Sequence, residues 1–162
     1  MFNGRRTLAE TSLIEGGEKG EEAQIAPKQE TDSADRPAPG ARPCILLVED
    51  DFLVGMEMEA GLADAGYIVA GVASTAEEAA ALAAERRPVL VVMDIRLASE
   101  RDGVDAALEI YRTLGIRSLF ASAHGDAQVK ARAEAARPLG WVAKPYRVET
   151  LLKAIEGALR EV

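Results

Sequence analysis

Acidic side chains and a lysine each follow a short apolar run in this chain. Glu49, Asp50 and Asp51 come directly after one run, Asp94 after a second and Lys144 after a third. If these runs are parallel strands, their carboxyl ends meet at one rim of the sheet and gather these groups together. Clustered carboxylates repel one another unless a cation lies among them. Mg2+ is held by one or two carboxylates and takes phosphate oxygens as further ligands, so the residues predict a site for a metal and a phosphoryl group.

Asp94 is the predicted nucleophile of this site. A carboxylate can accept a phosphoryl group, provided that the protein positions the reactants and neutralises the charge on the phosphoryl oxygens. Lys144 would neutralise that charge, and the hydroxyl of Ser122, which follows a fourth apolar run, would donate a hydrogen bond. A single aspartate after a strand is often only a turn former. Residues that suit phosphoryl transfer follow four different strands, and this combination favours Asp94 as a phosphoryl acceptor over Asp94 as a turn former.

Beyond Pro43, apolar runs alternate with Ala-rich and Glu-rich segments, which is typical of a parallel sheet with crossover helices. The predicted strands are Ile45–Val48, Ile68–Val72, Val89–Met93, Ser118–Ala121 and Trp141–Ala143. The predicted helices cover residues 52–65, 76–87, 104–114, 127–135 and 148–161. Because each run is apolar on consecutive residues, all five strands are expected to be buried on both faces. Right-handed crossovers then predict an α/β fold with a doubly wound five-stranded parallel sheet.

The helix ends carry local signals. Thr75 as N-cap and Glu78 three residues later form a predicted capping box. Asp51 is predicted to cap the first helix and is therefore left out of the metal site. The apolar face of that helix is predicted to consist of Leu53, Met56, Ala60 and Ala63.

Composition limits the classes of protein. The chain has 162 residues and a formal net charge of -8, which disfavours binding to nucleic-acid phosphates. No apolar run approaches the roughly 20 residues that a bilayer crossing needs, so no membrane span is expected. The single cysteine, Cys44, cannot form an internal disulfide, which fits a reducing cytoplasm. Residues 1–42 lack an apolar period and are predicted to be a disordered tail, and residues 43–162 are predicted to be one domain.

Four segments resemble the signature segments of bacterial response regulator receiver domains. They are ILLVEDD at 45–51, VVMD at 91–94, FASA at 120–123 and WVAKPY at 141–146. Each motif alone is weak, but the set is specific. The resemblance implies a flavodoxin-like (βα)5 fold and a phosphorylation-switched role in a two-component system or phosphorelay. An output domain after Val162 is not expected, and the protein is expected to be a stand-alone receiver similar to chemotaxis regulators.

The same resemblance implies a role for each matched residue. Asp94 is implied to be the phosphorylated aspartate, and Asp50 a direct Mg2+ ligand. Glu49 is implied to act on the metal at least partly through water. The main-chain carbonyl of Arg96, together with Asp94 itself, completes the implied protein ligands. Lys144 corresponds to the family's lysine beside the phosphoryl group.

The resemblance also implies switch residues and partners. Ser122 and Trp141 take the hydroxyl and aromatic switch positions, where the family usually has Tyr or Phe in place of Trp141. Pro145 is the implied cis proline. The implied phosphoryl donor is a histidine on a sensor kinase or a phosphotransfer protein. The implied output is binding to a downstream protein through the fourth helix, the fifth strand and the fifth helix. The resemblance does not decide between a monomer and a homodimer.

Two other functions are compatible with parts of this pattern. A haloacid-dehalogenase-type phosphatase also attacks phosphorus with an aspartate, but it requires an acid two residues later, where this chain has Arg96. A receiver-like module that binds partners without phosphorylation is disfavoured by the intact set of acids, hydroxyl and lysine. Apart from its own phosphorylation and dephosphorylation, the chain is not expected to catalyse a reaction.

Overall fold

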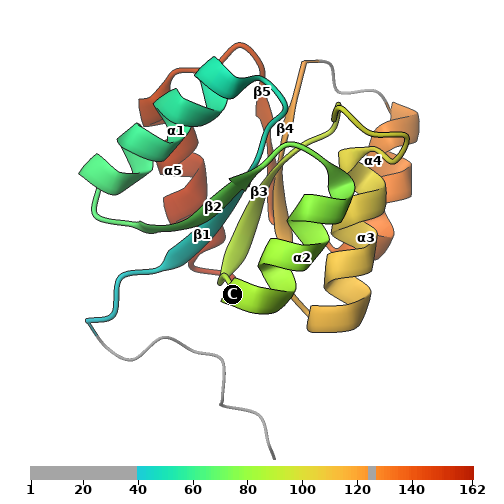
Figure 1. Cartoon of the computed structure of the whole chain (residues 1–162), viewed down its shortest axis with the longest axis horizontal. Coiled ribbons are helices and arrows are strands. Elements are labelled where there is room, and N and C mark those ends of the chain that lie inside the picture. Colours follow the sequence, from blue (N-terminus) through green and yellow to red (C-terminus); the bar gives the residue numbers. More distant parts are fainter. Residues whose placement is uncertain (1–39, 124–126) are drawn as a thin grey trace, which may run out of the picture. The chain divides into compact units, whose positions relative to one another are not determined.

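The computed structural model describes residues 40–123 and 127–162. A parallel sheet in this part of the chain has the strand order β2-β1-β3-β4-β5 (Figure 1). Its strands are β1 (Cys44–Val48), β2 (Ile68–Ala73), β3 (Leu90–Asp94), β4 (Ser118–Ser122) and β5 (Gly140–Ala143). The helices are α1 (Phe52–Asp64), α2 (Ala76–Arg86), α3 (Gly103–Leu114), α4 (Ala127–Ala133) and α5 (Val148–Ala158). This confirms the predicted doubly wound five-stranded fold, whose strand order reverses direction between β1 and β3.

The central strand β1 is covered by helices on both faces, which explains why its residues are apolar at consecutive positions. Ile45 and Leu47 of β1 belong to the core beneath α1 and α5, whereas Leu46 and Val48 belong to the core beneath α2, α3 and α4. Side chains alternate between the faces of a sheet, so a strand covered on both sides needs an apolar residue at every position. Figure 1 shows α1 and α5 on one side of the sheet and α2, α3 and α4 on the other.

The second strand is an exception to the predicted burial. β2 lies at the edge of the sheet, and Ile68 and Val72 are 42% and 37% exposed. The prediction that all five strands are buried on both faces is therefore wrong for β2, and also for the other edge strand, β5, where Ala143 is exposed. An apolar run alone does not distinguish an edge strand from a central one, because position in the sheet depends on how distant segments pair.

The predicted apolar face of the first helix is also wrong. Leu53 and Met56 are 74% and 51% exposed, and Ala60 and Ala63 are exposed as well. The buried residues of α1 are instead Gly55, Met58 and Leu62. Gly55 lies against Val72 of β2, which lets this helix approach the sheet closely. Because Gly55 has no side chain, the helix can approach Val72 more closely here than it could with a larger residue at this position.

The helix ends agree with the predicted signals in part. Thr75 caps α2, because its hydroxyl accepts a hydrogen bond from the Glu78 N–H at 3.2 Å. The Glu78 carboxylate, however, accepts hydrogen bonds from the N–H and hydroxyl of Ser74, one residue before the expected partner. α4 ends at Ala133 and continues as a short 3-10 helix over Glu134–Ala136, and α5 ends three residues before the predicted Glu161.

The predicted division into a tail over 1–42 and a domain over 43–162 stays a prediction. Residues 1–39 lie outside the described residues, and only Gly40, Ala41 and Arg42 of the tail lie within them, where all three are exposed. Among the helices in the described ranges, none combines the length and the apolar character that a bilayer crossing requires.

Candidate functional site

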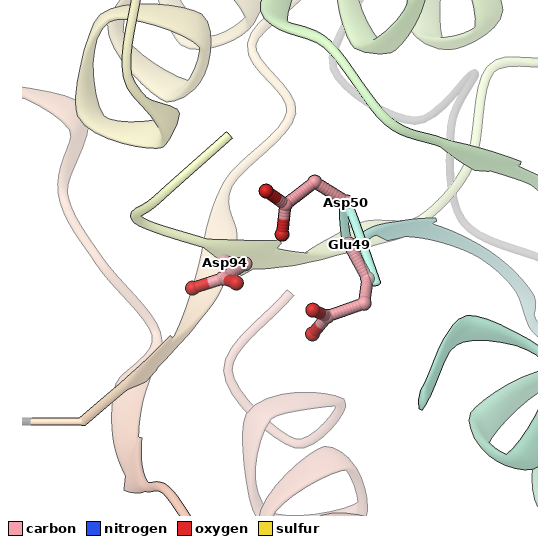
Figure 2. Close-up of side chains that lie close together, drawn as sticks. All are labelled: Glu49, Asp50 and Asp94. Atoms are coloured by element: carbon pink, nitrogen blue, oxygen red, sulfur yellow. The ribbon is translucent and has the colours of Figure 1, made fainter. Parts of the chain in front are cut away.

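Three carboxylates converge at the carboxyl ends of β1 and β3. These strands are neighbours, with Val48 opposite Met93, so the residues after Val48 face Asp94. Glu49, Asp50 and Asp94 each place a carboxylate oxygen within 4.8 Å of the others (Figure 2). Glu49 and Asp94 are 4% and 6% exposed, whereas Asp50 is exposed. The site therefore opens to solvent on the side of Asp50.

Lys144 reaches the same site from the end of β5. Its ammonium donates hydrogen bonds to Glu49 Oε2 at 2.5 Å and to Asp94 Oδ2 at 2.7 Å. The Lys144 N–H donates to the main-chain carbonyl of Ser122 at 2.8 Å, which fixes the start of the loop that carries the lysine. The peptide bond from Lys144 to Pro145 is cis. The ammonium thus lies between the two buried carboxylates.

The charges in this site are not balanced by the protein alone. Burial raises the pKa of Glu49, and the nearby Asp94 charge raises it further, against the opposing effect of Lys144. Burial alone would lower the pKa of Lys144, but the hydrogen bonds that its ammonium donates to Asp94 and Glu49 outweigh this effect and raise the pKa. The ammonium pairs with two of the three clustered carboxylates, Glu49 and Asp94, so one further cation would reduce the repulsion within the cluster. An all-oxygen donor set with one exposed member fits a hard divalent cation that retains several waters.

The remaining acidic residue of the first run has a different role. Asp51 is the N-cap of α1, and its Oδ1 accepts hydrogen bonds from the N–H groups of Leu53 at 2.9 Å and Val54 at 3.2 Å. Two backbone donors of the helix N-terminus are satisfied in this way. The geometry agrees with leaving Asp51 out of the metal site.

Arg96 contacts the site through its backbone. Its N–H donates to Asp94 Oδ1 at 3.3 Å, and its side chain is exposed. The first residues of the loop after β3 are therefore in direct contact with the Asp94 carboxylate. The role of the Arg96 carbonyl as a metal ligand stays a prediction.

The two predicted switch residues lie on neighbouring strands. Ser122 is the last residue of β4 and is half-buried. Trp141 of β5 is half-buried and stacks on Phe120 of β4, with ring centroids 4.8 Å apart and an interplanar angle of 18°. The Lys130 ammonium of α4 lies 5.5 Å from the centroid of the indole ring. The indole is thus packed between strand β4 and helix α4.

Sequence reasoning missed the polar contacts that hold α4 near the site. The Arg132 guanidinium of α4 donates to both carboxylate oxygens of Asp102 at 2.8 and 3.1 Å and to Asp105 at 3.0 Å. Asp102 also caps α3, since its Oδ1 accepts from the Asp105 N–H. An aspartate before Gly103 is a recognisable cap signal, but its pairing with a residue 30 positions later has no local signature.

Comparison with known proteins identifies the family. The family model of the response regulator receiver domain matches residues 45–156. The transcriptional regulatory protein PdtaR of Mycobacterium tuberculosis is 33% identical over 115 residues, which are 71% of this chain and 56% of PdtaR. The chain thus spans about half the length of this relative. The chemotaxis protein CheY of Thermotoga maritima is 30% identical over 112 residues, which are 68% of this chain and 92% of CheY.

A solved structure agrees with these relatives. The signal receiver domain of a modulated diguanylate cyclase from Desulfovibrio desulfuricans is 32% identical, and the similarity covers 75% of this chain and 96% of that domain with a TM-score of 0.69. Both the sequence and the arrangement of strands and helices are therefore shared. The chain belongs to the family of response regulator receiver domains, which act in two-component signalling.

Proposed function

We propose that Asp94 accepts a phosphoryl group from a histidine on a sensor kinase or a phosphotransfer protein, in the presence of Mg2+. Receiver domains bind Mg2+ at an acidic pocket, and this chain has a matching cluster. The proposed ligands are Asp50, Glu49, Asp94 and the main-chain carbonyl of Arg96. The observation that carries the proposal is the convergence of three carboxylates and the Lys144 ammonium at one point of the sheet edge.

The chemistry follows from the positions of these side chains. A carboxylate oxygen of Asp94 attacks phosphorus, an O–P bond forms, and the N–P bond to the donor histidine breaks with its electron pair leaving on the imidazole. Mg2+, when bound, neutralises charge on the phosphoryl oxygens. Lys144 already touches Asp94 and would pair with a phosphoryl oxygen. The Ser122 hydroxyl, at the adjacent strand end, would donate to another oxygen.

The output is proposed to be protein binding through α4, β5 and α5. A phosphoryl group brings a charge near -2 to the site, and the Ser122 hydroxyl and Lys144 can move to meet it. Trp141 lies on β5 between Phe120 and Lys130, so a shift of β5 or α4 would change this stack. The protein would then act as a cytoplasmic switch, and its only reactions would be its own phosphorylation and dephosphorylation.

Exposed apolar residues beside the acidic pocket support a protein as the phosphoryl donor. Phe52, Leu53 and Met56 are 76%, 74% and 51% exposed at the start of α1, directly after the acidic residues. A donor histidine that reaches Asp94 must bring its protein over this edge, and burial of these side chains would contribute to binding. A small donor would leave them in water.

The test is phosphorylation by a small donor in solution. The purified full chain is incubated with acetyl phosphate and Mg2+, and its intact mass is measured beside an Asp94→Asn variant and a sample with EDTA. We expect a gain of one phosphoryl group in the wild type with Mg2+ and no gain in either control. If the wild type shows no gain, or if Asp94→Asn gains as much, Asp94 is not the acceptor. The phosphorylation-independent binding module would then be the better description.

A further inference from the structure

The loop between β3 and α3, residues 95–102, is closed at its base against the phosphoacceptor. The N–H of Gly103 donates to the carbonyl of Ile95 at 2.8 Å, which brings the two ends of the loop together. Within the loop, the Arg96 N–H donates to Asp94 Oδ1. The position of the loop therefore affects both the orientation of the Asp94 carboxylate and the main chain of Arg96.

The far side of this loop is attached to the start of α2. The Ser99 hydroxyl accepts a hydrogen bond from the Ala76 N–H at 3.3 Å and donates to the Arg101 carbonyl at 2.7 Å. A second contact runs from the Ala98 N–H to the Ser74 carbonyl at 3.4 Å. Ala76 is the first residue of α2, so its N–H has no acceptor within the helix and is free to bond the loop.

Other contacts hold both α2 and the loop in place around this attachment. On the side of α2, Thr75 caps the helix and the Glu78 carboxylate holds the N–H and hydroxyl of Ser74. On the side of the loop, the Arg101 guanidinium pairs with Glu109 of α3 at 2.5 Å and with Glu77 of α2 at 3.7 Å. The Ser99 hydroxyl bonds main-chain atoms of both parts. It accepts from the N–H of Ala76 in α2 and donates to the carbonyl of Arg101 in the loop.

We propose that Ser99 is a positioning residue for Mg2+ binding: its hydroxyl ties the loop to α2 and so holds the Arg96 main chain beside Asp94. The inference rests on the proposed function, because it concerns the same metal site. Ser99 does not touch the carboxylates and acts only through the loop. A half-buried hydroxyl with both of its hydrogen bonds used in this way is more than a solvated surface group.

The test measures Mg2+ affinity in the full chain with Ser99→Ala and Ser99→Thr. Titration with MgCl2 is followed by the NMR shift of backbone amides around Asp94, which needs no phosphoryl donor. We expect Ser99→Ala to raise the dissociation constant for Mg2+ about fivefold, an effect of the size of one neutral hydrogen bond. Ser99→Thr keeps the hydroxyl and should restore the constant to within about twofold of wild type. Hydrogen exchange of the Ala76 amide should become faster in Ser99→Ala alone.

The matched control is Thr113→Ala. Thr113 also donates its hydroxyl to a main-chain carbonyl, that of Glu109 at 2.8 Å, but it lies at the opposite end of α3 from the loop. It should leave Mg2+ affinity unchanged. The role of Ser99 would be overturned if Ser99→Ala had the wild-type dissociation constant for Mg2+. It would also be overturned if Ser99→Thr did not reverse the increase in that constant. The proposed function would stand in both cases. Absence of Mg2+ binding in the wild type would overturn both.

Discussion

Replacing Lys144 by methionine should lower the rate at which Asp94 takes up a phosphoryl group from acetyl phosphate about a hundredfold. The Lys144 ammonium lies 2.7 Å from Asp94 Oδ2, so it is placed to neutralise charge on the oxygens of a phosphoryl group that arrives at Asp94. Loss of one such preorganised donor typically lowers a rate by a factor of about 100 to 1,000. Methionine keeps a flexible apolar stem of similar length, so the change removes mainly the charge. The rate is measured by intact mass against time at saturating Mg2+.

The same substitution should also destabilise the protein in magnesium-free buffer. Glu49 and Asp94 would keep their buried carboxylates without the cation that lies between them. Removing one partner of a fully buried pair costs about 3–5 kcal/mol, and we expect about 2 kcal/mol because 22% of the Lys144 side chain is exposed. Denaturant unfolding with and without Mg2+ measures this loss, which added Mg2+ should reduce.

Lys153→Met is the matched control for this experiment. Lys153 is exposed on α5 and makes no ion pair among the described residues. It should leave both the rate and the stability close to wild type. A Lys144→Met protein that takes up the phosphoryl group at the wild-type rate would show that the ammonium has no part in charge neutralisation.

The convergence of the acidic residues could be predicted from sequence because it depends only on strand order. Each of the residues Asp50, Asp94 and Lys144 follows an apolar run, and parallel strands align their carboxyl ends whatever the details of packing. The boundary of β3 differs by one residue, so Asp94 ends the strand instead of following it. This shift does not move the side chain away from the rim.

The faces of the outer elements could not be predicted in the same way. In α1 the spacing of Leu53 and Met56 suggested an inward face, but Gly55 and Met58 face the sheet instead. An interval of three or four residues fixes which side chains share a face and does not fix which face points inward. Close approach at Gly55 decides that orientation, and it depends on the position of Val72 on another strand.

Contacts made by the loop after β3 were also beyond sequence reasoning. Ser99 bonds Ala76, which is 23 residues earlier, and Arg132 bonds Asp102, which is 30 residues earlier. Such pairs follow from the way α2 and α4 are placed around the loop, and no motif within the loop encodes them.

Replacing Gly103 by alanine should destabilise the protein by about 3 kcal/mol, which is a large cost for one added methyl group. A Cβ at this position would lie 1.8 Å from the Asp94 carbonyl oxygen and 2.8 Å from the Asp94 carbonyl carbon. Both are backbone atoms of a buried strand end, so no flexible side chain can move aside. Either α3 or the end of β3 must shift. Thermal and denaturant unfolding measure the loss.

The Gly103→Ala substitution should also lower the rate at which Asp94 takes up a phosphoryl group, because the new methyl group would press against Asp94. A shift of the nucleophile by a fraction of an ångström lowers a rate by about tenfold or more. Gly157→Ala is the matched control, since nothing lies within 4 Å of a Cβ there and alanine in helix α5 should stabilise by about 0.5 kcal/mol. If Gly103→Ala behaved like Gly157→Ala, α3 would not pack as closely on Asp94 as the structure has it. The loop after β3 could then move independently of α3, and its closed base would not hold Asp94 in place.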